Sequence, residues 1–287
     1  MTSSPASVAH LIQDATIRIA AALDLPPREA RLEARVLAVH AWQVDAAWLI
    51  AHDTDLQTAA AIAVFQSLLA QRLEGLPIAY LVGSREFYGR PFQVSADVLI
   101  PRPDTELLVE LALAHLPANQ VVEVLDLGTG SGCIAITLAL ERPLARITAV
   151  DQSTAVLAVA QHNADQLQAQ VEFLSSDWFS ALTGRHFNLI VGNPPYIAAA
   201  DPHLARGDVR FEPMSALASG QDGFDDLRHL IQAASAHLKP GGTLLLEHGY
   251  DQAEAVRSLL HTHLFQTPRS WPDLAGILRV SGGKLSE

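Results

Sequence analysis

The sequence contains very little cysteine and no long uninterrupted apolar segment. A single cysteine, Cys133, excludes an intramolecular disulfide and is typical of a reducing compartment. No run reaches the apolar length that a membrane helix needs, and the first residues lack the basic and apolar segments of a secretion signal. We therefore expect an uncleaved cytoplasmic protein that does not bind membranes.

Positive charge is also scarce. Only Lys239 and Lys284 are lysines, and the net charge is −12. This balance disfavours a protein that wraps nucleic acid by neutralising phosphates, so no stable binding to nucleic acid is expected. The remaining composition, 49% hydrophobic and 17% charged, is that of a globular protein, and 287 residues are enough for two domains.

The N-terminal part is rich in alanine and has apolar residues at helical spacing. One apolar stripe runs from Val8 to Ile19 and another from Ile62 to Leu73. We predict a bundle of about four helices over residues 1–75. Residues 76–100 follow as a linker with a β-hairpin turning at Gly89-Arg90, and residues 101–287 as a catalytic domain.

A glycine-rich turn follows the first strand predicted in the catalytic domain. Val121–Asp126 is strand-like, and the sequence then reads Leu-Gly-Thr-Gly-Ser-Gly before an apolar helix that begins at Cys133. Such a turn presents backbone N–H groups and a helix N-terminus to a ligand. A dinucleotide fingerprint needs glycine at the position of Cys133, so a NAD site is disfavoured. Cys133 itself is expected to pack as a small buried residue.

Acidic side chains end or follow the next two predicted strands. Asp151 closes the strand Arg146–Asp151, about twenty residues beyond the glycine turn, where an acid commonly holds the hydroxyls of a ribose. Asp177 and Trp178 follow the strand Val171–Leu174. They could bind an adenine, or equally serve as a turn cap and a core residue.

The fourth predicted strand, Phe187–Val191, ends in Asn193-Pro194-Pro195-Tyr196. Consecutive prolines cannot continue a strand, so a rigid loop must follow. Taken alone, this loop could be a simple turn or a ligand site. Alternating strands and helices predict a doubly wound parallel sheet, which brings this loop, the glycine turn and the two acidic positions to one edge.

Together these motifs resemble a class I S-adenosylmethionine-dependent methyltransferase, with a Rossmann-like, mostly parallel sheet of seven strands. Four segments resemble the HemK/PrmC family more narrowly: Leu99–Glu106 (LIPRPDTE), Ser176–Phe179 (SDWF), Asn193–Ile197 (NPPYI) and Asp208–Pro213 (DVRFEP). That family methylates the glutamine of the Gly-Gly-Gln loop in peptide chain release factors.

The resemblance implies a role for each motif and a helical bundle that binds the release factor. The catalytic residues would be Asn193, Pro194 and Tyr196, and Pro195 would join them in binding substrate. S-adenosyl-L-methionine would be bound by Gly128, Thr129, Gly130, Ser131, Gly132, Asp151, Asp177, Trp178 and Asn193. A monomer is expected, and no metal is implied.

The chemistry can also be argued from the residues. An amide nitrogen is a poor nucleophile, whereas a sulfonium methyl is already activated. If the Asn193 side-chain oxygen and the Pro194 carbonyl each accept one N–H, the hydrogen bonds strengthen as positive charge develops on nitrogen. No general base is then required before attack. Tyr196 could form an aromatic wall against the amide or turn toward the core.

Several alternatives and open roles remain at this point. The same loop suits the amino groups of adenine or guanine, so a DNA or RNA amino-methyltransferase is an alternative. Others are a ribosomal-protein glutamine methyltransferase and a nucleotide-binding module without catalysis. Arg102, fixed between two prolines, could face a ligand, and residues 201–214 are a candidate lid or partner contact.

Overall fold

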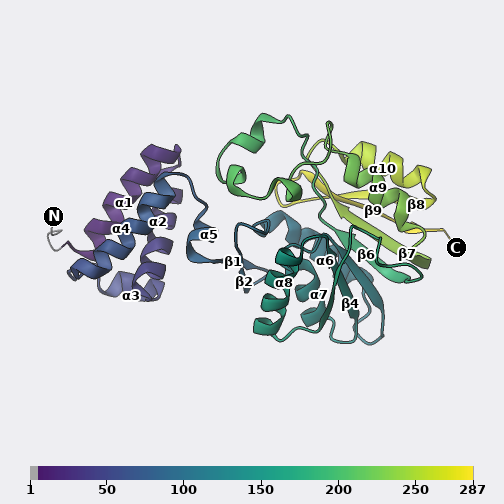
Figure 1. Cartoon of the computed structure of the whole chain (residues 1–287), viewed down its shortest axis with the longest axis horizontal. Coiled ribbons are helices and arrows are strands. Elements are labelled where there is room, and N and C mark those ends of the chain that lie inside the picture. Colours follow the sequence, from purple (N-terminus) through teal and green to yellow (C-terminus); the bar gives the residue numbers. More distant parts are fainter. Residues whose placement is uncertain (1–5, 287) are drawn as a thin grey trace. The chain divides into compact units, whose positions relative to one another are not determined.

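The computed structural model describes residues 6–286, which form two compact units (Figure 1). The first unit comprises the chain up to Ser84 together with Ala205–Phe211, and the second comprises Arg85–Leu204 and Glu212–Glu287. No helix within the described residues is long and apolar enough to cross a membrane. The proposed domain boundaries at residues 75 and 100 stay a prediction.

The first unit is helical. Its helices are α1 (Val8–Leu23), α2 (Pro27–Trp42), α3 (Ala46–Ala51), α4 (Ala59–Leu73) and the short α5 (Ile78–Val82). Pro27 occupies the first turn of α2, where its missing N–H costs nothing, and the Ser7 hydroxyl caps α1 by accepting from the His10 N–H. The predicted stripe from Val8 to Ile19 is buried in the core of this unit.

A buried arginine joins three segments of the first unit. Arg72 of α4 is 3% exposed; it pairs with Glu33 of α2 at 2.8 Å and with Asp208 at 2.8 Å. Arg210 donates to the Glu74 carbonyl at 2.8 Å. These contacts hold part of the polar segment after the Asn-Pro-Pro-Tyr loop against α4.

The predicted hairpin is present, with its turn one residue earlier than expected. Strands β1 (Ser84–Phe87) and β2 (Arg90–Gln93) form a two-stranded sheet. The turn residues are Tyr88 and Gly89, with φ of 52° and 72°, so the prediction of Gly89-Arg90 was wrong. Tyrosine rarely adopts a left-handed conformation, which is why the sequence favoured the later turn. The Tyr88 N–H is fixed by the Glu106 carboxylate at 2.8 Å.

The second unit contains the predicted seven-stranded sheet. The strands are β3 (Glu123–Leu127), β4 (Arg146–Asp151), β5 (Val171–Ser175), β6 (Phe187–Gly192), β7 (Leu238–Glu247), β8 (Phe265–Pro272) and β9 (Leu278–Leu285). They lie in the order β5-β4-β3-β6-β7-β9-β8. The first five pair in parallel, and only the pairs β7–β9 and β8–β9 are antiparallel.

Helices cover both faces of this sheet (Figure 1). One core includes side chains of α6 (Glu106–His115), α7 (Cys133–Glu141) and α8 (Thr154–Leu167), and the other includes α9 (Asp225–Ala234) and α10 (Ala253–Thr262). Successive residues of one strand serve opposite cores: Val124 belongs to the first and Leu125 to the second. Burial on both faces explains why these strands read as continuous apolar runs.

The strand order reverses direction between β3 and β6. From β3 the chain builds outward through β4 and β5, then returns to place β6 on the other side of β3. Ligands bind at such a switch point, beyond the carboxyl ends of the strands. Because Leu127 pairs with Gly192, the glycine turn after β3 and the Asn193 loop after β6 leave the sheet as neighbours.

Candidate active site

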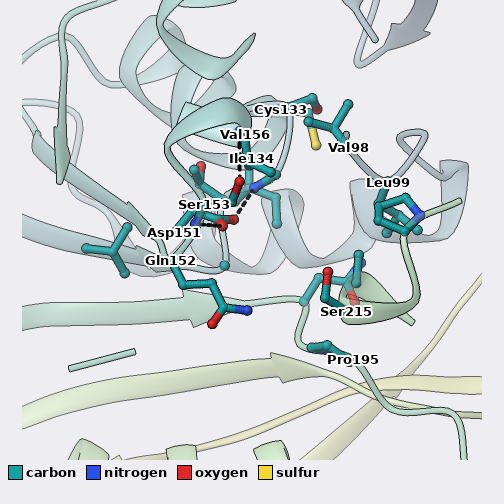
Figure 2. A pocket seen from close by; sticks show the side chains of 18 of the residues that line it. Val98, Leu99, Cys133, Ile134, Asp151, Gln152, Ser153, Val156, Pro195 and Ser215 are labelled. Atoms are coloured by element: carbon teal, nitrogen blue, oxygen red, sulfur yellow. Dashed lines mark hydrogen bonds between the residues drawn. The ribbon is translucent and has the colours of Figure 1, made fainter. Parts of the chain in front are cut away.

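A pocket opens at this edge of the sheet, within the second unit. Figure 2 shows Asp151 and Ser153 on one side of it and Pro195 and Ser215 on another. Its wall draws on every predicted motif, including residues from the segments 97–105, 128–134, 150–156, 176–178, 193–195 and 213–216. The predicted cofactor residues Gly128, Thr129, Gly130, Ser131, Asp151, Asp177, Trp178 and Asn193 all line it.

Two glycines of the turn have a positive φ and close neighbours. A Cβ on Gly132 would lie 2.7 Å from Cδ1 of Ile136, and φ at Gly132 is +83°. A Cβ on Gly128, where φ is +69°, would meet the indole of Trp178 at 3.2 Å. The positive φ favours glycine at both positions, and Gly132 also has no space for a side chain. Gly132 itself supports the turn from behind, because it packs against α7 and α8.

A buried carboxyl group lies beneath this turn. Asp126 is fully buried; its Oδ2 accepts from the Thr129 hydroxyl at 2.7 Å, whereas Oδ1 has no hydrogen-bond partner in the described part of the chain. Burial raises the pKa of Asp126 to about 7. Asp126 does not line the pocket itself, so it supports the glycine turn from below through Thr129.

Asp151, at the end of β4, holds the glycine turn in place. Its Oδ2 accepts from the Gly130 N–H at 3.3 Å and its Oδ1 from the Ser153 N–H at 3.1 Å. Burial raises the pKa of Asp151, and the backbone hydrogen bonds partly oppose that rise. Each oxygen has a second lone pair, so the carboxylate can still accept hydroxyl groups of a ligand.

Trp178 stands over the glycine turn in a constrained conformation. Its φ is +47°, and its indole Nε1 donates to Asp226 at 3.2 Å. The ring lines the pocket and also packs against the second core. Its position is therefore compatible both with binding an adenine and with a packing role. Asp177 beside it is exposed.

Asn193 is oriented by a neighbouring hydroxyl. Its Nδ2 donates to the Thr105 hydroxyl at 3.2 Å, and no described residue donates to its Oδ1. Pro195 lines the pocket with Asn193, while Pro194 is buried and is not among the described lining residues. The Pro194 carbonyl receives no hydrogen bond from a described backbone N–H.

Tyr196 points away from the lining residues and toward β7. Its ring packs against the second core, and its hydroxyl donates to Glu247 at 3.3 Å. Burial and the charge of Glu247 raise the pKa of Tyr196. A contact between the ring and a planar substrate amide stays a prediction.

Arg102 has an acidic partner in the structure. Its guanidinium pairs with Glu212, which is 4% exposed and also accepts from the Ile100 N–H at 3.0 Å. Glu212 thereby joins the Pro-Arg-Pro-Asp-Thr-Glu segment to Pro213, and both Pro101 and Pro213 line the pocket. The guanidinium remains partly exposed and lines the pocket too.

Replacing Glu212 by alanine should destabilise the protein by about 1–3 kcal/mol, because the Ile100 N–H and Arg102 lose their acceptor. Urea unfolding measures this change. Glu212→Gln keeps an oxygen for the Ile100 N–H and should lose less. An unfolding midpoint of Glu212→Ala equal to that of the parent protein would contradict this structural role.

Four buried polar residues near the pocket were not predicted as site residues. Asp126, Thr105, Glu212 and Glu247 are buried and bear polar groups at or behind the pocket. Glu247 ends β7 as Asp151 ends β4, so an acid at a strand's carboxyl end was an available signal. Cys133 packs as expected: it is buried, and burial raises the pKa of its thiol to about 12.

Two family models and several known relatives match this chain. Residues 104–207 match the methyltransferase small domain, and residues 10–83 match the PrmC N-terminal domain. A release factor glutamine methyltransferase of Bordetella pertussis is 52% identical over 256 residues, which cover 89% of this chain and 95% of the relative. One from Burkholderia pseudomallei is 47% identical and covers 98% and 97%.

Solved structures support the fold. A methyltransferase from Pyrococcus furiosus aligns with a TM-score of 0.54 at 15% identity, covering 77% of this chain and all of that one. A 16S rRNA N2 G1207 methyltransferase of T. thermophilus, in complex with AdoMet and guanosine, aligns at 0.52 with 23% identity, covering 70% of this chain and 49% of that chain. With the fold shared by these structures and near-complete alignment to the curated relatives, the chain belongs to the release factor glutamine methyltransferase family.

Proposed function

We propose that this protein transfers the methyl group of S-adenosyl-L-methionine to the side-chain amide nitrogen (N5) of the glutamine in the Gly-Gly-Gln loop of peptide chain release factors. The observation that carries the proposal is the orientation of Asn193. Its Nδ2 is engaged by Thr105, so its Oδ1 is the atom available to a substrate N–H. The choice of a release factor as substrate follows the names of relatives that are about half identical.

Asn193 and Pro194 would hold the two hydrogens of the substrate amide. With the Asn193 Oδ1 and the Pro194 carbonyl each accepting one N–H, the nitrogen lone pair is turned out of conjugation with the amide carbonyl. Both hydrogen bonds become charge-assisted as nitrogen gains positive charge, which favours the transition state over the ground state. Pro195 lies beside Asn193 in the wall, and its ring stiffens the loop.

The cofactor site fits the residues present. Gly128 and Gly130 line the pocket, and nothing lies within 4 Å of the point that a Cβ on Gly130 would occupy, so a ligand can approach the backbone of the glycine turn closely. Asp151 has acceptor capacity for ribose hydroxyls, and Trp178 offers a flat apolar surface for an adenine. S-adenosyl-L-methionine, when bound there, supplies a methyl group already activated by the sulfonium.

Typical energies indicate that positioning the two reactants contributes more to the rate than the individual hydrogen bonds do. A charge-assisted hydrogen bond contributes about 1.5–3 kcal/mol, or about ten- to a hundredfold in rate. Fixing two reactants in line contributes up to about 7–11 kcal/mol. Asn193 and Pro194 therefore act mainly by fixing the nitrogen. The amide becomes strongly acidic once methylated, so its proton leaves to water without a dedicated base.

The proposal extends to partners and location. The helical bundle predicted over residues 1–75 would bind the release factor, and the protein would act in the cytoplasm as a monomer. Its net charge of −12 disfavours a nucleic-acid acceptor.

The experiment is methyl transfer from labelled S-adenosyl-L-methionine to a panel of acceptors. The panel contains a release factor, the same factor with its Gly-Gly-Gln glutamine replaced, a glutamine-bearing ribosomal protein, DNA and RNA. Label is expected only in the unmodified release factor. Label in nucleic acid or in the ribosomal protein would overturn the proposed substrate, and failure to bind the cofactor would overturn the enzymatic proposal.

A further inference from the structure

Three polar side chains from separate elements meet behind Asn193. Thr105 lies in the short 3-10 helix η1 (Pro103–Thr105), Tyr196 follows β6, and Glu247 ends β7. Asn193 Nδ2 donates to the Thr105 hydroxyl at 3.2 Å, and the Tyr196 hydroxyl donates to Glu247 Oε1 at 3.3 Å. The Thr105 hydroxyl also interacts with the Glu247 carboxyl, whose Oε2 has no other hydrogen-bond partner among the described residues. Thr105 is 2% and Glu247 1% exposed, so water does not compete for these contacts.

The charge of Glu247 sets the direction of the hydrogen bonds. An ionised carboxylate only accepts, whereas a hydroxyl group has a single hydrogen to donate. When Thr105 donates that hydrogen to Glu247, its oxygen must accept from its other neighbour. That neighbour is the NH2 group of Asn193. The Asn193 oxygen must therefore face away from Thr105.

The orientation of Asn193 matters because the two ends of an amide have nearly the same shape. Rotation by half a turn would present NH2 to the substrate in place of oxygen. A donor there would repel the N–H groups of the substrate amide and compete for its lone pair. Packing alone does not distinguish the two orientations; the hydrogen-bond partner does.

We propose that Glu247, acting through Thr105, fixes the side-chain amide of Asn193 with its oxygen toward the substrate, and is a positioning residue for methyl transfer. The inference rests on the proposed role of Asn193 as acceptor. Tyr196 contributes from the other side, because its hydroxyl occupies Glu247 Oε1 and restrains the carboxylate.

The network should depend on pH. Burial, together with the charge of Asp104, raises the pKa of Glu247 to about 7. The interactions of Glu247 with Thr105 and Tyr196 and the positive charge of Arg279 partly oppose this rise. Below that pH the carboxyl carries a proton and can itself donate to Thr105, so it no longer dictates the orientation of Asn193. The turnover number should rise as pH rises through about 7. The charged and titratable groups around the network are Arg102, Asp104, Asp126, Cys133, Tyr196, His248 and Arg279.

The first test compares Glu247→Gln, Thr105→Val and Thr105→Ser in the full-length protein, with release factor as acceptor. Glu247→Gln and Thr105→Val should each lower kcat about ten- to a hundredfold. Thr105→Ser keeps the hydroxyl and should stay close to the parent. The assays use saturating cofactor, so that a change in cofactor affinity through Asp126 does not affect kcat. The loss of kcat at low pH should disappear in Glu247→Gln and in Thr105→Val.

Two controls separate positioning from stability. Thr137→Val makes the same substitution as Thr105→Val at a fully buried position of α7 outside the pocket. This variant should leave kcat unchanged. The double variant of Thr105 and Glu247 should be no worse than either single variant, because the residues act in series. Equal kcat in all variants would overturn the proposal. So would losses that add and leave the pH profile unchanged.

A spectroscopic readout does not need turnover. The side-chain NH2 resonance of Asn193, identified by its absence in Asn193→Ala, should shift with pH around a midpoint near 7 and lose this shift in Thr105→Val and Glu247→Gln. A resonance insensitive to pH and to both variants would contradict the network. If the parent protein labels another acceptor, the proposed substrate fails, and the same variants tested on that acceptor still decide the role of Glu247.

Discussion

Asn193→Ala is expected to lower the rate of methyl transfer about a hundred- to a thousandfold or more, while the affinity for S-adenosyl-L-methionine stays within a few-fold. The variant removes one of the two acceptors that fix the substrate nitrogen, and a single preorganised hydrogen-bonding group is typically worth that factor. It also leaves the Thr105 hydroxyl without its donor. Single-turnover kinetics and calorimetric titration with cofactor measure the two quantities separately.

Asn188→Ala is the matched control for this variant. Asn188 lies in β6, the strand that ends just before Asn193, and its side-chain oxygen accepts from the Glu123 N–H at 2.9 Å and from Lys239 at 3.0 Å. Losing these contacts should reduce stability without changing the rate of methyl transfer. If Asn193→Ala lost cofactor binding and methyl transfer in equal measure, the main role of Asn193 would be in the cofactor site, and its proposed role as acceptor for the substrate amide would be wrong.

Asp151→Ala should weaken cofactor binding about a hundredfold or more. The carboxylate would accept hydroxyl groups of the ribose, and charged hydrogen bonds are worth about 1.5–3 kcal/mol each. The variant also removes the acceptor for the Gly130 N–H, so the glycine turn loses a support. Calorimetric titration with S-adenosyl-L-methionine measures the change in Kd.

Asp151→Asn keeps the size of the side chain and one oxygen acceptor, so a smaller loss is expected. Asp165→Ala serves as the control: Asp165 is an exposed acid of α8, hydrogen-bonded to Gln161 at 2.9 Å and outside the pocket. It should bind the cofactor as the parent does. Unchanged affinity in Asp151→Ala would place the ribose elsewhere.

The sheet was predictable because its strands are short, apolar and separated by clear helical periods. Strand β4 has the predicted bounds, and the predicted edge of the sheet carries the pocket. Strand β7 begins at Leu238 and runs through Lys-Pro-Gly-Gly, a sequence typical of a turn, with an irregular register beside Phe187. Local turn residues gave no sign of that continuation.

The polar contacts behind Asn193 were beyond local sequence reasoning. Thr105, Asn193 and Glu247 lie far apart in the chain, and each has an adequate local explanation as a helix start, a turn or a strand end. Their meeting depends on β6 and β7 being neighbours and on the placement of the segment before α6. The partner of Arg102 was hidden for the same reason, because Glu212 is 110 residues away.

The central claim is tested most directly by the mass of one peptide. A release factor is incubated with the protein and S-adenosyl-L-methionine, digested, and the peptide containing Gly-Gly-Gln is sequenced by tandem mass spectrometry. The account predicts one added methyl group on the side-chain amide of that glutamine, absent when Asn193→Ala replaces the parent protein. An unmodified glutamine beside a methylated ribosomal protein or nucleic acid would contradict it.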